Sequence, residues 1–370
     1  MKKYTFVIGI VILFLSGCTY FDGYKLNYVP KIGFSNRVMT VKNNYICWHE
    51  TLFFGDSVYK LDNGIYKKTG DSIYDLFHVD RMPIYEDIRQ YNNLVAAVAE
   101  DMDKFLVYDL NSQTLHVYDI YGEGNKVLYT WYVYNGKIYY MVQSDMNILD
   151  RRFVCMDMAT GDNEEIYFPT QNEQGGRLLL ADFAMREDGT VMAEIYNRDT
   201  REMEYRRISI GEDGEISDEK IWATDQYLYS YVLQYNKYGF FLLGEFPTVE
   251  NGEKTETICL KDNGAVQKIN ILSLYGLIMT DTGYFLCGNS KDESVMEDVN
   301  DLISGEFDSI FFYNFDGEII EKYYLDCEEY SKEGYKLETM IYTDNKILII
   351  YLNDNGDMKF TNLLLSEQMR

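Results

Sequence analysis

The sequence predicts an all-β fold, a β-propeller of seven four-stranded blades, with six or eight blades as the alternatives. Composition, two recurring hairpin patterns and the spacing of their turns lead to this prediction. The 370 residues include 35 Tyr and 20 Phe but only 4 Pro, and Asn-Gly and Asp-Gly pairs are frequent. Aromatic and β-branched residues favour strands, while Asn-Gly and Asp-Gly pairs favour tight hairpin turns.

The first pattern is a short apolar run, a polar turn and a stronger apolar run. The first copy reads VMTV-KNN-YICW, and Val95–Leu106, which resembles a helix in isolation, takes a strand position in the second copy. The seven copies have their turns near Asn44, Asn93, Gly136, Gly189, Gly239, Gly283 and Asn345. We expect each copy to form the two inner strands of one blade.

The second pattern is a strand, a turn and a returning strand of mixed polarity. Its six copies turn at Gly64, Gln113, Gly161, Gly214, Gly264 and Gly317, at intervals of 48 to 53 residues. Two hairpins per repeat make a four-stranded sheet, and a repeat of about 50 residues with four strands is typical of a propeller blade. One such sheet cannot bury both of its faces alone, so the sheets must stack around a ring.

The last blade lacks a second hairpin because the chain ends where its turn would fall. Its three predicted strands are Tyr335–Tyr342, Lys346–Leu352 and Met358–Leu365. We expect the apolar segment Leu26–Phe34 to supply the missing outer strand and so close the ring. Pro30 suits this position, because an outermost strand needs fewer backbone donors.

We expect the first seventeen residues to form a leader. Lys2 and Lys3 precede an apolar stretch, Phe6–Leu15, that is too short for a membrane-spanning helix. The following Leu15-Ser16-Gly17-Cys18 resembles the lipobox of bacterial lipoproteins. The resemblance implies cleavage before Cys18 and acylation of its thiol, which would hold the protein at the extracytoplasmic side of the cell membrane. We therefore divide the chain into a signal peptide (1–17), a lipidated tether (18–25) and a propeller domain (26–370).

The net negative charge of the chain restricts the kinds of molecule that it can bind. The chain carries 34 Lys and Arg against 60 Asp and Glu, and loss of Lys2 and Lys3 with the leader changes its net charge from −26 to −28. Such a surface repels phosphate backbones and anionic head groups, so we expect no nucleic-acid partner and membrane attachment through lipid alone. The remaining possibilities are a protein or envelope-glycan partner, bound by a monomer.

Cysteine and histidine patterns point to neither a metal nor a cofactor. Beyond Cys18, the five cysteines are odd in number and form no C-x-x-C pair, which argues against a disulfide framework and a cysteine zinc site. Their neighbours indicate buried strand positions for Cys47, Cys155, Cys259 and Cys287, unlike Cys327. The three histidines, His49, His78 and His116, are not spaced as a metal pair, and acid pairs such as Asp101 with Asp103 lack the spacing of a calcium loop.

One turn carries a family resemblance. Val154–Tyr167, which reads VCMDMATGDNEEIY, resembles the D-x-x-T-G turn of quinoprotein-type and outer-membrane-assembly propellers. Those families dock their repeats with a tryptophan, and here the only tryptophans are Trp48, Trp131 and Trp222. The resemblance therefore implies a propeller turn, and neither the quinone cofactor nor the assembly partner is carried over.

Propeller ligands commonly meet the loops at one face of the ring. The candidate loops are Gln143–Arg152, Thr170–Arg177, Glu245–Glu256 and Asp292–Glu306, and the last contains a predicted short helix or acidic loop. Arg151 and Arg152 stand out as a basic pair, although pairing with Asp150 would leave them a structural role. The candidate ligand-face residues are Asp145, Asp150, Arg151, Arg152, Arg177, Glu245 and Glu250.

Two functions remain open at this stage. The first is a non-catalytic binding or scaffold module for a protein or envelope glycan, favoured because no nucleophile, P-loop or metalloprotease motif occurs. The alternative is a saccharide-acting hydrolase or lyase that uses carboxylates at the mouth of the propeller channel.

Overall fold

The structure is a computed structural model of the full chain. It describes residues 45–54, 57–80, 88–144, 147–166, 178–210, 216–224, 229–248, 252–273, 277–295, 308–325, 327–343 and 346–364. The chain divides into two units, Met1–Gly33 and Phe34–Arg370, and every described residue belongs to the second. The strand predicted over Leu26–Phe34 and the leader around Cys18 therefore lie outside the described residues.

The described residues form an all-β structure of antiparallel sheets, which confirms the predicted fold class. We group the strands into seven repeat units in chain order. Unit one contains β1 (Tyr45–Trp48), β2 (Thr51–Phe54), β3 (Ser57–Asp62) and β4 (Ile65–Ser72). Unit two contains β5 (Ile88–Tyr91), β6 (Leu94–Val98), β7 (Lys104–Asp109) and β8 (Thr114–Asp119). Unit three contains β9 (Asn125–Tyr134), β10 (Lys137–Ser144), β11 (Asn147–Asp157) and β12 (Asn163–Glu165).

Units four to six have the same order of four strands, and unit seven has three. Unit four contains β13 (Leu178–Met185), β14 (Val191–Asn197), β15 (Glu202–Ile210) and β16 (Ile216–Thr224), and unit five contains β17 (Tyr229–Tyr235), β18 (Phe240–Thr248), β19 (Gly252–Leu260) and β20 (Val266–Ile269). Unit six contains β21 (Ile278–Met279), β22 (Tyr284–Gly288), β23 (Ser309–Tyr313) and β24 (Ile319–Tyr324). Unit seven contains β25 (Tyr335–Thr343), β26 (Lys346–Asn353) and β27 (Met358–Leu364). The strands predicted for the last blade agree with β25 to β27 to within one residue at each end.

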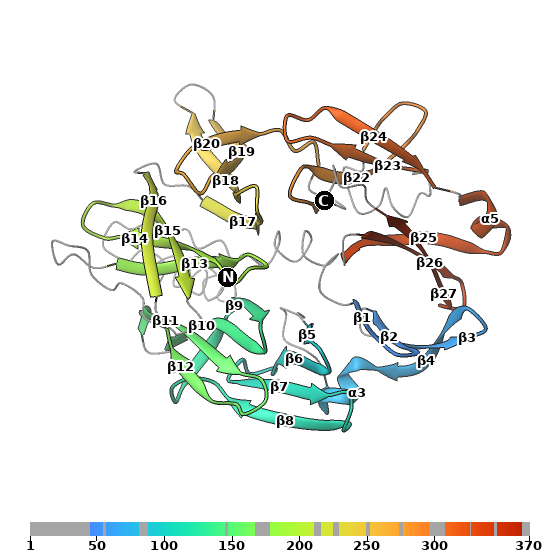
Figure 1. The fold of residues 1–370 in the computed structure, drawn as a ribbon, viewed down its shortest axis with the longest axis horizontal. Helices are drawn as coiled ribbons and strands as arrows, with labels where there is room; N and C mark the ends of the chain where they lie inside the picture. Colours follow the sequence, from blue (N-terminus) through green and yellow to red (C-terminus); the bar gives the residue numbers. More distant parts are fainter. Residues whose placement is uncertain are drawn as a thin grey trace, which may run out of the picture. The chain divides into compact units, whose positions relative to one another are not determined.

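The sheets are arranged as a six-bladed β-propeller, one blade fewer than the seven that we expected. Units two to six each form a four-stranded sheet, whereas units one and seven share a single sheet in the order β1-β2-β3-β4-β27-β26-β25. The two units merge because Met358 of β27 pairs with Tyr66 of β4. Figure 1 shows the sheets following one another in chain order, with β5, β9, β13 and β17 on the inner side of their sheets. Among the described residues, the strand beside β27 on its outer edge is therefore β4.

The first hairpin was predicted one strand too early. The sequence pattern paired VMTV with Tyr45–Trp48 around Asn44, but in the structure Tyr45–Trp48 pairs with Thr51–Phe54 around a turn at His49 and Glu50. The residues of VMTV lie outside the described part of the chain. The short apolar run TLFF resembles a loop in sequence because it is only four residues long. The other six inner hairpins pair as predicted.

Seven hydrophobic clusters hold the units together, and each contains residues from two neighbouring units. Strand β6 illustrates the cause. Val95 and Ala97 face unit one, whereas Ala96 and Val98 face unit three, because successive side chains of a strand point to opposite faces. A strand buried on both faces reads as a continuous apolar run, which explains LVAAV. The seventh cluster joins unit seven to unit one and completes the circle.

Aromatic packing supplies much of the buried surface. Phe105 of unit two is fully buried against Trp131 and Tyr140 of unit three, with ring centroids 5.4 and 5.0 Å apart. Burying a side chain of this size contributes about 1.5 to 3 kcal/mol. Cys155, Cys259 and Cys287 are buried in such clusters as free thiols, which confirms their predicted role as apolar strand residues.

The turns are built by the residue types that the pattern contained. The D-x-x-T-G turn begins at Asp157, whose Oδ1 accepts the backbone N–H groups of Ala159 and Thr160 at 2.8 and 3.0 Å. The turn ends at Gly161, whose φ of +78° favours glycine. A Cβ on Gly161 would lie 2.2 Å from the ring of Tyr118 in the preceding unit, and the Tyr118 hydroxyl donates to the Ala159 carbonyl at 3.0 Å. A tyrosine of the preceding unit therefore packs against this turn.

Helix is rare in the described residues. The helix α3 (Ile73–Phe77) begins with a capping box, in which Ser72 accepts the Tyr74 N–H and Asp75 accepts the Ser72 N–H. Ile73 and Phe77 of α3 are buried between units one and two. The other short helix is α5 (Cys327–Lys332). In the described parts of the chain, neither helix has the length and apolar character needed to cross a bilayer.

Candidate functional site

The residues predicted for the ligand face are only partly described. Asp145, Arg177 and Glu250 lie outside the described residues. Asp150 lies on β11 and Glu245 on β18, and their side chains are outside the described part of the molecule. Arg151 and Arg152 can be followed in detail.

Arg151 and Arg152 do not form a common basic patch, because adjacent residues of β11 point to opposite faces. Arg151 reaches the next unit, where its Nη1 donates to the carbonyls of Leu180 and Ala181 at 3.2 and 2.8 Å. Its Nε donates to Gln143 Oε1 at 3.1 Å. Arg151 therefore ties β11 to the inner strand β13.

The contact of Arg151 falls on an irregular point of β13. The pairing of β13 with β14 shifts register between Leu180 and Asp182, so Ala181 is an extra residue in the strand. A bulge leaves backbone groups outside the regular ladder, and the Arg151 guanidinium satisfies carbonyls there. The structural role of Arg151 is to stabilise this bulge.

Arg152 extends to the other face. Its Nη1 donates to Glu165 Oε1 at 2.9 Å, and the Tyr121 hydroxyl donates to Glu165 Oε2 at 2.9 Å. The bond to Glu165 raises the pKa of Tyr121, because the carboxylate disfavours a phenolate. Arg152, Glu165 and Tyr121 thus form a small solvent-accessible set on the outer part of unit three.

The insertion in unit six has a well-defined base. Ser290 donates its backbone N–H and its hydroxyl to the Asp308 carboxylate at 2.7 and 2.6 Å, and Ser309 adds a further hydroxyl donor at 2.9 Å. Burial alone raises the pKa of Asp308, but these donors outweigh it and lower the pKa. The helix or acidic loop predicted within 292–304 falls mostly on residues 296–304, outside the described residues.

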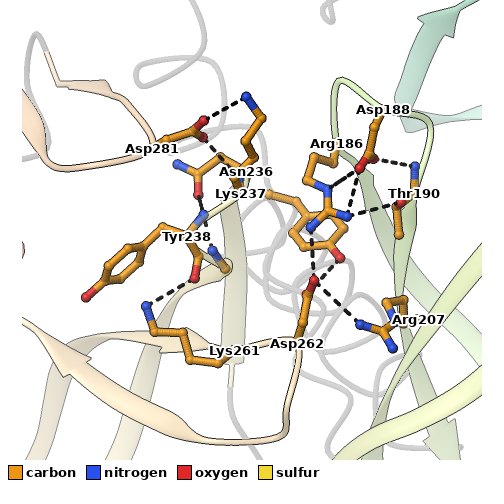
Figure 2. Close-up of polar contacts among 12 residues, drawn as sticks. Arg186, Asp188, Thr190, Arg207, Asn236, Lys237, Tyr238, Lys261, Asp262 and Asp281 are labelled. Atoms are coloured by element: carbon orange, nitrogen blue, oxygen red, sulfur yellow. Dashed lines mark hydrogen bonds and ion pairs between the residues drawn. The ribbon is translucent and has the colours of Figure 1, made fainter. Parts of the chain in front are cut away.

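A larger ionic network lies at the turns between units four and five, on the loops opposite those that we predicted (Figure 2). Arg186, from the β13–β14 turn, pairs with Asp188 at 2.8 Å and with Asp262 of the β19–β20 turn at 3.0 Å. The Tyr235 hydroxyl donates to the second oxygen of Asp262 at 3.0 Å, and Arg207 approaches Asp262 at 3.5 Å. One carboxylate thus receives groups from three strands or turns of two units.

In this network the pKa shifts favour the charged forms of Asp188 and Arg186 and the neutral form of Tyr235. Partial burial by itself raises the pKa of Asp188, but hydrogen bonds from Arg186 and Thr190 outweigh it and lower the pKa to about 2. Burial likewise opposes the charge on Arg186, and its bonds to Asp188 and Asp262 raise its pKa instead. Burial and the charge of Asp262 raise the pKa of Tyr235. The Arg186 side chain is 15% exposed, whereas its partners Asp188 and Asp262 are 53% and 35% exposed, so the guanidinium is mostly buried while the carboxylates stay in contact with solvent.

A second set of bonds joins unit five to unit six (Figure 2). Asn236 Nδ2 donates to the Thr280 carbonyl at 2.7 Å, and the Lys237 N–H donates to Asp281 Oδ1 at 3.0 Å. Within unit five, Lys261 Nζ donates to the Tyr238 carbonyl at 3.1 Å beside these bonds. These bonds repeat at one interface what the Arg186 network does at the preceding one.

A further charged set is buried within unit four. Glu204, whose side chain is 4% exposed, accepts Asn197 Nδ2 at 3.1 Å and pairs with Arg206 and Lys220, both at 3.2 Å. Burial raises the pKa of Glu204, but the bonds from Asn197 and Lys220 outweigh it and lower the pKa. Arg206 also pairs with Asp218 at 2.8 Å.

Glu338 behaves differently from these acids. It is the extra residue at a register shift in β25, the first strand of unit seven, and it is exposed to solvent. Surrounding protein atoms nevertheless raise its pKa by desolvation. Among the described acids whose pKa is shifted, Glu338 is the one that moves upward, which is the direction required of a carboxylic acid that donates a proton.

The chemistry of these groups is mostly internal neutralisation. In the part of the chain that the structure describes, no three His, Cys, Asp or Glu side chains are placed to share a metal ion. Sequence reasoning missed the Arg186 network because its members lie 76 residues apart, in turns whose residue types are ordinary for hairpins. The usable signal was an arginine inside the MREDG turn of a predicted hairpin.

The fold places the chain among β-propeller proteins. No family model matches it, and no curated protein matches it. Solved structures with a similar arrangement include oligogalacturonate lyase from Vibrio parahaemolyticus, with a TM-score of 0.46, 12% identity and coverage of 90% of both chains. Apo AztD from Citrobacter koseri has a TM-score of 0.41 and 10% identity over 88% of this chain and 87% of its own.

A post-proline cleaving enzyme from Rickettsia typhi is similar over part of its length. It has a TM-score of 0.45 and 10% identity, and the match covers 80% of this chain but 46% of the enzyme. At these identities and TM-scores the similarities carry no argument about activity. The assignment to the propellers stands on the sheets and on the clusters that join them.

Proposed function

We propose that the chain is a lipid-anchored propeller at the extracytoplasmic side of the cell membrane, and that it binds a protein or envelope glycan without transforming it. The observation that carries this proposal is the internal use of charge. The described arginines that approach more than one carboxylate, Arg186, Arg206 and Arg207, are paired between or within units. They stabilise unit four and its contact with unit five and leave the excess of acids to the surface.

The acid excess indicates the chemistry of the partner. With a net charge of −26, the protein attracts cationic surfaces and repels phosphate-rich ones. A basic protein segment or an uncharged or amine-bearing glycan satisfies this condition. Complementary charge would raise the association rate and make binding weaken with added salt.

Lipid anchoring and binding can be tested in one strain. Labelling with an alkyne palmitate analogue should mark the wild-type chain and not the Cys18→Ala variant, and only the wild type should remain in the membrane fraction. Absence of label on the wild type contradicts the anchor.

Crosslinking in intact cells, followed by detergent solubilisation and pull-down, should recover the same partner with the wild type at low salt and less of it at high salt. The purified soluble chain should leave envelope glycans chemically unchanged. Recovery of no specific partner, together with glycan turnover, would reverse the proposal.

Glu338 supports a second candidate, a saccharide hydrolase or lyase. Its raised pKa and its exposed position on a bulge of an inner strand are features of a general acid. If this candidate is right, purified protein depolymerises an acidic or neutral polysaccharide and Glu338→Gln removes the activity while the circular dichroism spectrum is unchanged. Equal activity of the two proteins contradicts a catalytic role for Glu338.

A further inference from the structure

The contact between units one and seven differs from every other contact in the ring. We call this contact the seam, defined by β4, β27 and the cluster of Leu52, Tyr59, Tyr66, Leu348, Ile350 and Met358. At the other contacts the two units are consecutive in the chain. At the seam the two units come from opposite ends of the repeat array, so no short connection keeps them together.

Backbone pairing at the seam is minimal among the described residues. Strand β27 pairs with β26 at all seven of its residues but with β4 at Met358 alone. The third strand of unit two, β7, instead pairs along its length with β8 as well as with β6. The seam therefore depends on side-chain packing, as do the contacts between the other units, whose sheets share no backbone pairing in the described residues.

Side-chain contacts at the seam are also few in the described structure. Its cluster has six buried members, whereas the clusters at the other six contacts have eight to thirteen. Lys67 Nζ pairs with Asp357 Oδ2 at 2.8 Å, but Lys67 is 46% exposed, and exposed ion pairs contribute little. Tyr66 stacks on Phe360 with ring centroids 5.4 Å apart.

These observations indicate which contact between neighbouring units takes the least free energy to separate. Breaking a contact between consecutive units removes a larger cluster, and the connecting chain limits how far the units can move. Breaking the seam removes the smallest cluster, one backbone pair and the bonds of Asp357 to the Lys67 side chain and the Lys68 backbone, and the entropy of two ends that are 290 residues apart favours the open form.

We infer that the ring opens at the seam, so that units one and seven separate while the other contacts stay packed. Opening exposes the face of β26 that carries Leu348 and Ile350 and leaves covered the opposite face, which carries Ile347 and Ile349 against unit six. This inference does not rest on the proposed function.

The two faces of β26 provide a matched test. Ile350 and Ile347 are both fully buried residues of the same strand. In Ile350→Cys the new thiol faces the seam, and in Ile347→Cys it faces unit six. Both variants of the soluble chain are treated with a maleimide under native conditions, and the rate of modification at each new cysteine is followed by peptide mass spectrometry.

Opening at the seam predicts that Ile350→Cys reacts at least tenfold faster than Ile347→Cys. Adding Lys67→Met should increase the rate at residue 350 several-fold and leave the rate at residue 347 unchanged. Equal rates at the two positions overturn the inference, because global unfolding exposes both faces together. Should either variant fail to fold, Leu348→Cys and Ile349→Cys repeat the comparison on the same two faces.

Discussion

Arg186 provides the sharpest test of the ionic network between units four and five. Replacement of Arg186 by Met keeps the aliphatic stem and removes the guanidinium. The variant loses ion pairs to Asp188, which is 53% exposed, and Asp262, which is 35% exposed. Pairs with such exposure contribute about 0.5 kcal/mol each. The guanidinium also lies 5.0 Å from the centre of the Tyr235 ring, a cation–π contact that contributes about 1 kcal/mol when partly desolvated.

The hydrogen bond from Arg186 to Thr190 and the desolvated Asp262 left behind add about 1 kcal/mol. The sum predicts that Arg186→Met lowers the free energy of unfolding by about 2 to 3 kcal/mol. Urea denaturation followed by tryptophan fluorescence measures this loss. Arg186→Lys keeps the charge without the planar fork, so it should lose about half as much.

The matched control for Arg186 is Lys237, whose ion pair with Asp281 is similar in kind but has a lysine that is 74% exposed. Lys237→Met should change the free energy of unfolding by less than about 0.5 kcal/mol. The reasoning is refuted if Arg186→Met destabilises the protein no more than Lys237→Met does.

Three further predictions concern the acid, the turn and the core. Because the pKa of Asp188 falls to about 2 on folding, its contribution is present above its unfolded value near 4 and is lost as pH falls towards 2. Stability curves of wild type and Asp188→Asn should therefore run parallel from pH 5 to 8 and converge below pH 4, and a constant difference contradicts this. Gly161→Ala should lower the melting temperature, measured by differential scanning fluorimetry, more than Gly64→Ala does. Both glycines have a positive φ, but a Cβ at Gly161 would meet the Tyr118 ring, whereas a Cβ at Gly64 would meet open space. Equal losses would show that the packing against Tyr118 is irrelevant to stability. Phe105→Ala should cost about 3 to 5 kcal/mol in the same urea assay, because Phe105 is fully buried between two units, and a loss below about 1 kcal/mol is incompatible with that packing.

Local features of the fold were readable in the sequence. A hairpin joins residues that are close in the chain, so apolar runs, turn glycines and Asn-Gly pairs report it directly. This is why the strands of the last unit were placed to within one residue, and why the D-x-x-T-G sequence marked a real turn. The first hairpin was misplaced because a four-residue strand carries little periodic signal.

The number of blades depended on a non-local contact. Hairpin counting found seven units, and the structure keeps all seven, but a pairing between Tyr66 and Met358 joins the first unit to the last in one sheet. No residue near Tyr66 in sequence indicates that its neighbour will be Met358. A hairpin pattern therefore counts units and not sheets.

The candidate site shows the same division between local and tertiary information. The sequence marked Arg151 and Arg152 as a pair because they are adjacent, yet a strand directs adjacent side chains to opposite faces and separates them. Arg186 and Asp262 looked ordinary in sequence and meet only because consecutive units stack.

The sequence by itself determined the class of fold, the seven units, the acidic character and the expectation of a lipid anchor at Cys18, since each follows from composition or from short-range pattern. Only the tertiary structure decided how the ring closes and which charges neutralise one another. The physical reason is that these contacts join residues 76 to 290 positions apart, where the packing of whole sheets selects the partners.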